Sequence, residues 1–375
     1  MDFSYAALRR FPDVEAPNLQ AWDATDELLV QRALAAGIDG AAITVIGDEY
    51  GAITLALTAA GLHGIRVHQD LATGRRALAR NASELGIAGF SSHELDESLL
   101  SGARLVLLQL PKALAELEEI ADAVARWAAP DVTLIAGGRV KHMTVTQNEV
   151  IGRSFGVVQA QRAERKSRLI MATESREVPV RPPYPQHSRH AEFDLELVAH
   201  GGAFAANRID IGTRVLLDVL GGRHPRAAGR DGVTVVDLGC GTGALAAFFA
   251  MRHPEARITA TDRSAAAVQS ARATMAANGL EDRVVVTHDD AASELPDASA
   301  DLILLNPPFH LGASVHSGAA TRLFEAAARV LRPGGELLTV FNSSLAYRPE
   351  LTRLIGPTEQ VHRTSKFTVT SSVKR

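Results

Sequence analysis

The chain has 375 residues, which is long for a single domain, and its 46% hydrophobic and 22% charged residues are typical of an ordinary globular protein. A formal net charge of −4 argues against a protein that coats nucleic acid through overall positive charge. The lone cysteine, Cys240, excludes an intramolecular disulfide framework, the apolar stretches are too short for a membrane span, and the scattered histidines form no metal motif. We therefore expect a cytoplasmic protein with no membrane or metal partner.

The first half of the chain contains apolar runs separated by helical stretches. Residues 42–54 predict a buried strand, a loop and the start of a helix. A second run ends at Asp70, and a third, residues 105–109, is followed by residues 110–112, Leu-Pro-Lys. Strands that alternate with helices favour a parallel α/β sheet, and we expect residues 1–185 to form one such domain.

Basic residues gather over residues 139–168, where seven Lys or Arg and two Glu give a local charge of +5 (7 − 2). The seven are Arg139, Lys141, Arg153, Arg162, Arg165, Lys166 and Arg168. Such a stretch fits a surface that binds phosphate groups and equally fits the solvated face of a helix. A proline-rich segment follows at 181–185, and residues 186–198 are interpreted as the linker between two domains.

In the second half, residues 232–245 predict a buried strand, a glycine loop and the start of a helix. Gly239, Gly241 and Gly243 alternate with other residues, so the loop can turn sharply and bring backbone N–H groups close to a ligand. Asp237 precedes the loop, where it would repel a pyrophosphate but would pair with the ammonium group of an amino acid. The pattern therefore favours a ligand with an amino-acid group.

Acidic residues follow the next two predicted strands. The first ends at Asp262, 19 residues after Gly243 (262 − 243), where a ribose-binding carboxylate belongs in a βαβ unit. The second, residues 283–288, is followed by Asp289 and Asp290, which could accept a hydrogen bond from an adenine amino group.

The fourth strand, residues 301–305, leads into Asn306, Pro307, Pro308 and Phe309. Prolines have no N–H to donate and leave their carbonyl groups free, and the residue before a proline is pushed out of the α region. An amide oxygen, a rigid carbonyl and a flat ring suit the binding of a planar group with an exocyclic NH2. A plain Pro-Pro turn after a buried strand is the alternative for these four residues alone.

Taken in this order, the glycine loop, Asp262, Asp290 and Asn306 resemble the class I methyltransferases that use S-adenosylmethionine and methylate exocyclic or amide nitrogens. The resemblance implies a doubly wound parallel sheet over residues 199–375, with the cofactor across the carboxyl ends of the strands. A nicotinamide dehydrogenase is the alternative for the glycine loop, but it leaves the Asn-Pro-Pro-Phe residues without a role.

Residues 204–214 are similar to the Phe…Asp-x-Gly element that closes over the cofactor in the methyltransferase small domain family, which would place Phe204 and Asp210 at the cofactor. The alternative is an ordinary helix entry that Asp210 caps.

The first half repeats the second half in degenerate form. Gly51, Asp70 and Gln109 precede Gly241, Asp262 and Asn306 by 190 (241 − 51), 192 (262 − 70) and 197 (306 − 109) residues. In this alignment Glu49 and Ile53 replace the outer glycines. The steady period predicts two tandem class I methyltransferase (Rossmann-like) α/β domains, the first degenerate and the second active. The alternative is that the first copy binds a different nucleotide.

A degenerate and a complete methyltransferase domain in tandem resemble the bacterial ribosomal RNA guanine-N2 methyltransferases over nearly the whole chain. Residues 110–118, 135–138 and 366–374 are more like the enzyme that acts on large-subunit (23S) RNA than its small-subunit (16S) sister, whereas the loop 311–316 departs from the pattern. The resemblance implies that ribosomal RNA is the partner and that the first domain recognises it.

By the same resemblance, the Asn306 side-chain oxygen and the Pro307 carbonyl would accept the two hydrogens of guanine N2, and Phe309 would stack on the base. The base must then be unpaired or flipped out. Methylation of a protein glutamine amide, DNA adenine methylation and an inactive RNA-binding assembly factor are the alternatives. The modified guanine and the oligomeric state do not follow from the sequence.

Overall fold

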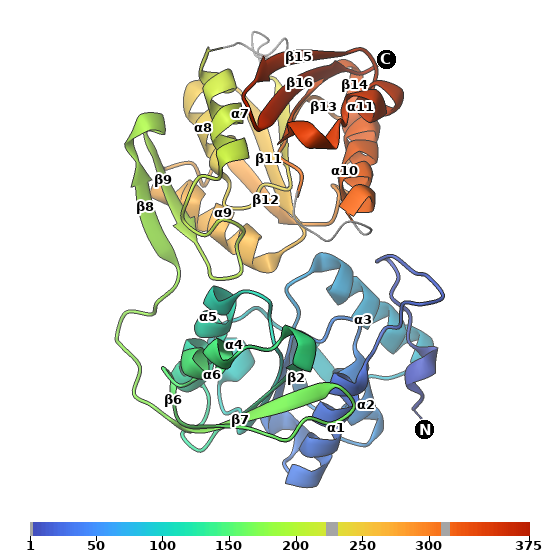
Figure 1. Ribbon diagram of the computed structural model, residues 1–375, viewed down its shortest axis with the longest axis vertical. Helices are drawn as coiled ribbons and strands as arrows, with labels where there is room; N and C mark the ends of the chain where they lie inside the picture. The colour runs from blue at the N-terminus through green and yellow to red at the C-terminus, as the bar shows by residue number, and fades with distance from the viewer. Residues whose placement is uncertain (1–2, 223–231, 309–315) are drawn as a thin grey trace. The chain divides into compact units, whose positions relative to one another are not determined.

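The computed structural model describes residues 3–222, 232–308 and 316–375 (Figure 1). The chain divides into two compact units, Met1–Tyr184 and Pro185–Arg375, which we call unit 1 and unit 2. Each unit holds a seven-stranded sheet with helices on both faces (Figure 1). In the described part of the chain, no helix has the length and apolarity that crossing a membrane requires.

Unit 1 places its helices between its strands along the chain. Its helices are η1 (Tyr5–Ala7), α1 (Ala24–Ala36), η2 (Gly40–Ala42), α2 (Ala52–Ala59), α3 (Ala72–Leu85), α4 (Glu97–Leu100), α5 (Leu114–Trp127), η3 (Val140–His142) and α6 (Val145–Ile151). Its strands are β1 (Ile43–Ile46), β2 (Ile65–His68), β3 (Phe90–Ser92), β4 (Leu105–Gln109), β5 (Thr133–Arg139), β6 (Phe155–Ala160) and β7 (Ser167–Ser175).

Unit 2 begins with a two-stranded hairpin and then repeats the alternation of strand and helix. Its strands are β8 (Gln186–His190), β9 (Leu195–Ala199), β10 (Thr234–Leu238), β11 (Arg257–Asp262), β12 (Val284–His288), β13 (Ala300–Leu305), β14 (Leu331–Asn342), β15 (Thr358–Arg363) and β16 (Phe367–Val373). Its helices are η4 (Ala191–Phe193), α7 (Ile211–Gly222), α8 (Ala244–Arg252), α9 (Ala265–Ala277), α10 (His316–Val330), η5 (Ser343–Leu345) and α11 (Arg348–Leu354).

The two seven-stranded sheets have the same strand order. The order is β3-β2-β1-β4-β5-β7-β6 in unit 1 and β12-β11-β10-β13-β14-β16-β15 in unit 2. In each sheet the first five strands in this order pair in parallel, whereas the sixth strand, β7 or β16, is antiparallel to both of its neighbours. An identical order with an identical change of direction is what duplication of a whole domain predicts.

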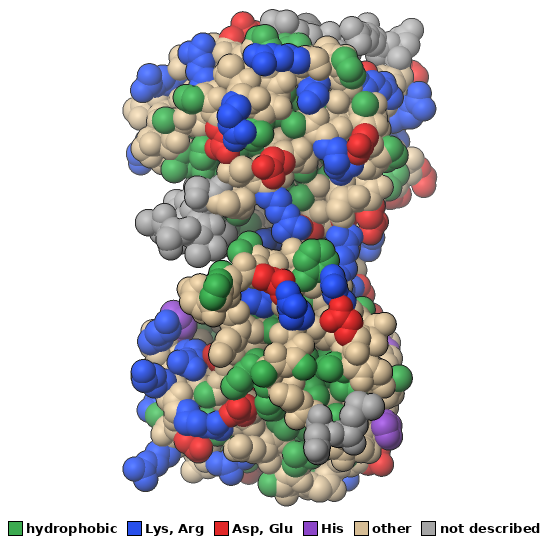
Figure 2. All heavy atoms as spheres, turned by 90° about the vertical axis from the view of Figure 1, so that its right-hand side faces the viewer, with side chains coloured by type: hydrophobic (Ala, Val, Ile, Leu, Met, Phe, Trp, Pro, Cys, Tyr) green, Lys and Arg blue, Asp and Glu red, His purple; other side chains and the backbone are tan. Residues whose placement is uncertain are grey.

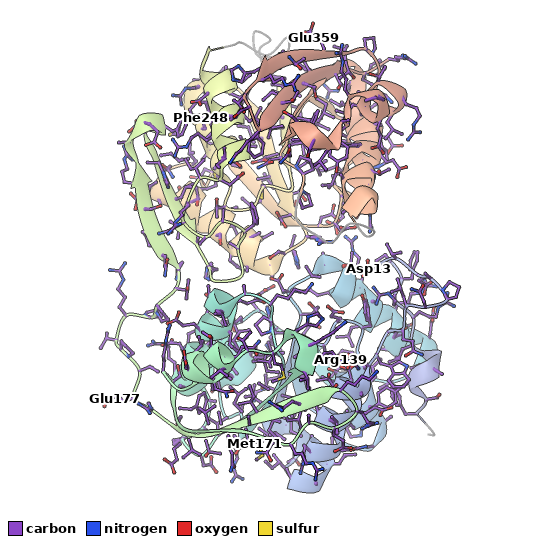
Figure 3. The ribbon with its side chains drawn as sticks, viewed as in Figure 1. Asp13, Arg139, Met171, Glu177, Phe248 and Glu359 are labelled. Carbon is purple, nitrogen blue, oxygen red and sulfur yellow. The ribbon has the colours of Figure 1, made fainter. Side chains whose placement is uncertain are left out.

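The central strands of both sheets are buried on both faces, which explains their continuous apolar runs. In β10, Val235 lies in the core under α7, α8 and α9, whereas Val236 and Leu238 lie in the core under α10 and α11. Phe248 of α8 adds an edge-to-face contact with Phe193, with ring centres 5.9 Å apart (Figure 3). The sheet is thus fixed from both sides, so its strand ends are held in place.

The structure corrects the alignment of the two glycine loops. Gly47 N donates to the β2 residue His68, as Gly239 N donates to the β11 residue Thr261. Gly51 precedes α2 with φ 90°, as Gly243 precedes α8 with φ 80°. Unit 1 therefore keeps both outer glycines, and the expectation that Glu49 and Ile53 replace them is wrong.

Glu49 in fact takes the place of the central Gly241. By strand pairing, Gln69 corresponds to Asp262, because both accept a hydrogen bond from the backbone N–H two residues later. The sequence predicts Asp70 at the position of Asp262, which is one residue too late. From sequence alone, Gly51 can be aligned with Gly241 or with Gly243, because the glycines of the loop in unit 2 lie two residues apart.

Residues 186–198 do not form the expected linker, because β8 and β9 pair as an antiparallel hairpin there. The backbone of β9 is bound to α9: Val198 N donates to Thr274 Oγ1 at 3.0 Å, and Glu196 N donates to Asn278 Oδ1 at 3.1 Å. This hairpin belongs to unit 2, which begins at Pro185.

Candidate active site

The glycine loop between β10 and α8 leaves open space beside its backbone. Gly239 and Gly241 have φ values of 73° and 54°, and a Cβ atom built on either would meet nothing within 4 Å. Gly243 differs, since a Cβ there would lie 2.8 Å from the Met275 side chain, so this glycine serves helix packing. The first two glycines therefore provide a surface on which a ligand can lie against the backbone.

Asp237 lies at the end of β10 and is only 1% exposed. Its Oδ2 accepts a hydrogen bond from Ala246 N at 2.9 Å, and its Oδ1 has no hydrogen-bond partner among the described residues. Burial raises the pKa of Asp237 from 3.8 to about 7. A buried carboxylate with one unused oxygen fits a cationic group of a ligand, and the predicted contact with an ammonium group stays a prediction.

Asp262 fixes the position of the glycine loop relative to β11. Its Oδ2 accepts from Gly241 N and its Oδ1 from Ser264 N, both at 2.9 Å. The carboxylate therefore lies beside the loop, where a ribose-binding acid was expected.

The two acids after β12 have different environments. Asp289 is 2% exposed and accepts hydrogen bonds from the Ser293 hydroxyl and, at 2.9 Å, from Glu294 N, so it stabilises the turn that follows. Asp290 is also buried and forms an ion pair with Arg322 of α10. Asp289 therefore stabilises a turn and Asp290 pairs with α10, and the adenine contact predicted for these two acids stays a prediction.

Asn306 follows β13, next to the glycine loop, because Leu305 pairs with Leu238. Its Nδ2 donates to Asp210 Oδ2 at 3.1 Å and to Thr213 Oγ1 at 2.9 Å. Its Oδ1 is buried and has no hydrogen-bond partner among the described residues. The amide thus keeps one strong acceptor for an incoming donor.

Pro307 is buried and Pro308 is exposed. Phe309 and the loop residues 310–315 lie outside the described residues, so the predicted stacking role of Phe309 stays a prediction.

Asp210 caps α7, since its carboxylate accepts from Gly212 N at 2.9 Å and from Thr213 N at 3.3 Å. The same carboxylate holds the Asn306 amide, so the capping role and a role in the site coexist. Phe204 lies in the loop before α7 and is 63% exposed, and its cofactor role likewise stays a prediction.

Cys240, inside the glycine loop, is buried, and burial raises the pKa of its thiol well above the ordinary value. No group of three or more His, Cys, Asp or Glu residues that could hold a metal ion occurs in residues 3–222, 232–308 and 316–375.

The equivalent place in unit 1 is built differently. Gln109, at the position of Asn306, donates through its Nε2 to Asp26 of α1. Asp26 is buried, and burial together with the nearby Asp48 raises its pKa to about 8. With Glu49 at the central glycine position and Gln69 at the ribose-acid position, unit 1 lacks the central glycine and the strand-end acid that unit 2 presents.

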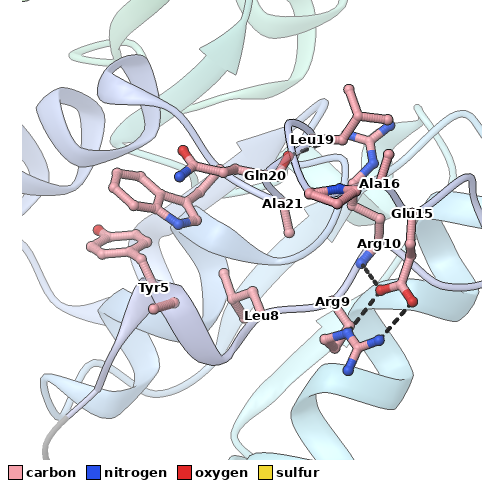
Figure 4. Close-up of a pocket in the computed structure, with 12 residues that line it drawn as sticks. Tyr5, Leu8, Arg9, Arg10, Glu15, Ala16, Leu19, Gln20 and Ala21 are labelled. Atoms are coloured by element: carbon pink, nitrogen blue, oxygen red, sulfur yellow. Dashed lines mark hydrogen bonds and ion pairs between the residues drawn. The ribbon is translucent and has the colours of Figure 1, made fainter.

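The N-terminal segment of unit 1 packs against this altered loop. Tyr50 Oη donates to Asp13 Oδ2 at 2.7 Å, and the Arg10 guanidinium lies 4.6 Å from the Tyr50 ring centre. The segment encloses a hollow of about 490 Å³ between Tyr5 and Trp22 (Figure 4). None of the residues that line this hollow corresponds to the glycine loop or the Asn306 position.

Two family models together cover most of the chain. The N-terminal domain of RLMG matches residues 1–176, and the methyltransferase small domain matches residues 194–371. The ribosomal RNA large subunit methyltransferase G of Streptomyces avermitilis is 36% identical, over 98% of this chain and 97% of its own length. The protein of the same name from Stutzerimonas stutzeri is 35% identical, over 100% of this chain and 99% of its own length.

The chain belongs to the ribosomal RNA large subunit methyltransferase G family. The solved 16S rRNA N2 G1207 methyltransferase of T. thermophilus, in complex with AdoMet and guanosine, has the same fold. The TM-score is 0.73 with 24% identity, and the match covers 94% of this chain and 92% of that one. The expected fold, two tandem class I methyltransferase domains, is thereby confirmed, as is the expected family.

Two residues that contact the predicted site residues, Thr213 and Arg322, were not among those that the sequence predicts. Thr213 stands three residues after the capping Asp210, a spacing at which side chains interact across the first turn of a helix. That spacing could have pointed to Thr213. Arg322 reaches Asp290 from a helix that follows 26 residues later (316 − 290), and nothing in the local sequence signals the contact.

Proposed function

We propose that the chain transfers a methyl group to the exocyclic N2 amine of a guanine in 23S ribosomal RNA, with S-adenosylmethionine as the cofactor. Membership of the methyltransferase G family supports the large subunit, because the named relatives match over their full length. The observation that carries the proposal is the Asn306 amide, whose nitrogen is held by protein groups and whose oxygen is left to accept.

The residues of unit 2 fit this cofactor. The space beside Gly239 and Gly241 would hold it against the backbone, the unused Asp237 Oδ1 would pair with its ammonium group, and Asp262 would bind its ribose. Asp290 would accept from the adenine amino group. When bound, S-adenosylmethionine supplies the methyl group.

The residues that bind the guanine have to orient a poor nucleophile. The lone pair of guanine N2 is delocalised into the ring, so the amine must be oriented with its hydrogens bound to acceptors. Asn306 Oδ1, which has no hydrogen-bond partner among the described residues, and the carbonyl oxygen of Pro307 would be those acceptors. Positioning then contributes most of the rate enhancement, without a strong general base.

We further propose that unit 1 recognises the RNA. The charge of the basic stretch 139–168 is smaller than the sequence predicted, because residues from elsewhere in unit 1 neutralise part of it. Arg139 Nη1 forms an ion pair with Asp23 Oδ2 at 3.7 Å, and Arg153 Nη1 forms one with Glu118 Oε1 at 2.5 Å. Figure 2 shows acidic side chains among the Lys and Arg side chains of this unit.

Three exposed residues of the stretch, Lys141, Arg162 and Lys166, form no ion pair with the described residues. They lie after β5 and in the turn between β6 and β7, at the same edge of the sheet, because Arg139 pairs with Ser167. That edge corresponds to the catalytic edge of unit 2, and these three side chains are the best candidates for phosphate contacts.

The alternatives are less well supported. Glutamine methylation was expected with a small helical N-terminal domain, whereas residues 1–176 match a domain of the methyltransferase G family. The family name favours 23S over 16S RNA, and we propose that the reaction takes place in the cytoplasm, where ribosomal RNA is assembled.

The test is methylation of unmodified 23S and 16S transcripts by the full chain, followed by mass spectrometry of the nucleosides. We expect N2-methylguanosine in the 23S transcript. Asn306→Ala should leave the Kd for S-adenosylmethionine within about threefold and lower kcat roughly 10²- to 10³-fold, the cost of removing one positioned hydrogen-bond group.

Gln109→Ala is the matched control, since it removes the equivalent amide from unit 1 and should leave kcat unchanged. Product in 16S RNA alone, or full turnover by Asn306→Ala, would contradict the proposal.

A further inference from the structure

The side-chain amide of Asn306 can face its neighbours in two orientations, and only one leaves the oxygen available. The oxygen and the nitrogen of a side-chain amide have almost the same size and shape, so the two orientations are distinguished by whether the neighbouring groups donate or accept hydrogen bonds. Asp210, once ionised, has acceptors only, and one of its oxygens lies 3.1 Å from the Asn306 amide. Turning the amide over would place an oxygen against a carboxylate, which is unfavourable.

Thr213 adds a second constraint. Its hydroxyl donates to Asp210 Oδ2, so its single proton is already used. The hydroxyl can therefore offer only a lone pair to Asn306 Nδ2, 2.9 Å away. Both neighbours of the amide nitrogen are thus acceptors, and they reinforce each other because Asp210 fixes the direction of the Thr213 hydroxyl.

The start of α7 fixes both groups in space. Asp210 is held by the backbone N–H groups of Gly212 and Thr213, and Thr213 is three residues further along the same first turn. A Cβ atom on Gly212 would lie 3.1 Å from Asn306 Oδ1, so the absence of a side chain there leaves the oxygen uncrowded. The start of α7 therefore holds the side-chain amide of Asn306, which follows the strand β13.

Unit 1 repeats this arrangement. Asp23 caps α1 with its side chain, Asp26 stands three residues later, and Asp26 accepts from the amide of Gln109. In both units, the third residue of the capped helix thus accepts a hydrogen bond from the amide nitrogen that follows the fourth strand.

We infer that Asp210 and Thr213 are positioning residues for the methyl transfer, which fix the Asn306 amide with its oxygen free to accept from the guanine amine. The inference rests on the proposed function, because it assigns the amide oxygen to that amine. Asp210 then acts through Asn306, in addition to any contact with the cofactor.

The experiment compares Thr213→Val, Thr213→Ser and Asp210→Asn in the full chain. Thr213→Val keeps the shape and removes the acceptor, and we expect kcat to fall roughly three- to tenfold. Asp210→Asn still caps a helix but can donate to a reversed amide, and kcat should fall roughly 10- to 100-fold. Thr213→Ser should keep the kcat of the parent chain, while the KM for RNA, the Kd for S-adenosylmethionine and the Tm change little in both Thr213 variants.

Thr352→Val is the matched control, because it removes a hydroxyl that bonds only the Arg348 carbonyl within its own helix. The decisive arm introduces Thr213→Val into Asn306→Ala, where it should cause no further loss of kcat. A further loss in that background, or a fall in kcat matched by a fall in Tm, would overturn the inference.

A measurement that needs no turnover separates this inference from the proposed function. In protein with ¹⁵N-labelled asparagine, the Asn306 side-chain signal is identified by its disappearance in Asn306→Ala. Its NH2 hydrogens should exchange slowly with water in the parent chain and faster in Thr213→Val. Slow exchange in a chain that does not methylate guanine would contradict only the proposed function, and equal exchange in parent and variant would contradict the positioning role.

Discussion

Replacement of Asp237 by Asn removes a buried charge and keeps an acceptor for the Ala246 N–H. Because burial raises the pKa of Asp237 from 3.8 to about 7, folding takes up a proton between those pH values. The free energy of unfolding of the parent chain therefore falls as the pH rises from about 4 to about 7, and above pH 7 this group causes no further change. One pKa unit corresponds to about 1.4 kcal/mol, so the loss between pH 5 and pH 8 is about 3 kcal/mol.

Asn does not titrate, so the Tm of the variant minus that of the parent should rise by roughly 6–12 °C from pH 5 to pH 8. Differential scanning calorimetry of the full chain measures this difference. Both tryptophans, Trp22 and Trp127, belong to unit 1, so melting followed by tryptophan fluorescence identifies the transition of that unit. The unit 1 transition should not respond to the substitution and serves as the internal control.

The same carboxylate predicts a pH-dependent affinity. An ammonium group favours the ionised form of Asp237, so the Kd of the parent chain for S-adenosylmethionine should fall about tenfold per pH unit from pH 5 to pH 7. Asp237→Asn should bind weakly and without this slope in isothermal titration calorimetry. A difference in Tm that is independent of pH, or tight binding by the variant at pH 8, would show that Asp237 is not the titrating partner of the cofactor.

Two further predictions concern RNA binding and the turn after β12. Reversing the charges of Lys141, Arg162 and Lys166 to Glu should weaken RNA binding and lower the salt slope by roughly 0.7–0.9 per lost phosphate contact, in fluorescence titrations at several salt concentrations. The same change at Arg104, which pairs with Asp131, is the control. An equal effect at Arg104 would show that the three residues have no special role in RNA binding. Asp289→Ala should lower stability by about 1–3 kcal/mol in urea unfolding, because it removes two hydrogen bonds that hold the turn, and should change the Kd for S-adenosylmethionine less than Asp290→Ala does.

The sequence was most informative where glycines, acids and prolines follow apolar runs. Strand ends in a parallel sheet meet at one edge, so the order of Gly239, Asp262 and Asn306 along the chain was enough to place them together. The repeat was visible for the same reason, although the loop alignment was displaced by two residues.

The features that the sequence did not reveal depend on contacts between distant segments. The prolines and histidines near residues 186–198 predict a linker, whereas these residues belong to a hairpin whose strand β9 is bound to Thr274 and Asn278 of α9. Asp289 and Asp290 are adjacent in sequence and looked equivalent. Only the folded chain shows that one carboxylate stabilises a turn and the other pairs with Arg322.

The identical strand order of the two sheets bears on how the chain is synthesised. Similar neighbouring domains can exchange equivalent elements and become trapped in misassembled states. The last strand of unit 1 ends at Ser175, before any residue of unit 2 has been added. The first strand of the second sheet, β10, ends at Leu238, 63 residues after Ser175 (238 − 175), and translation of these residues takes roughly 3–13 s at ordinary rates. During this interval no strand of the second sheet is complete, so the direction of synthesis itself gives unit 1 time to form its own sheet without a competitor.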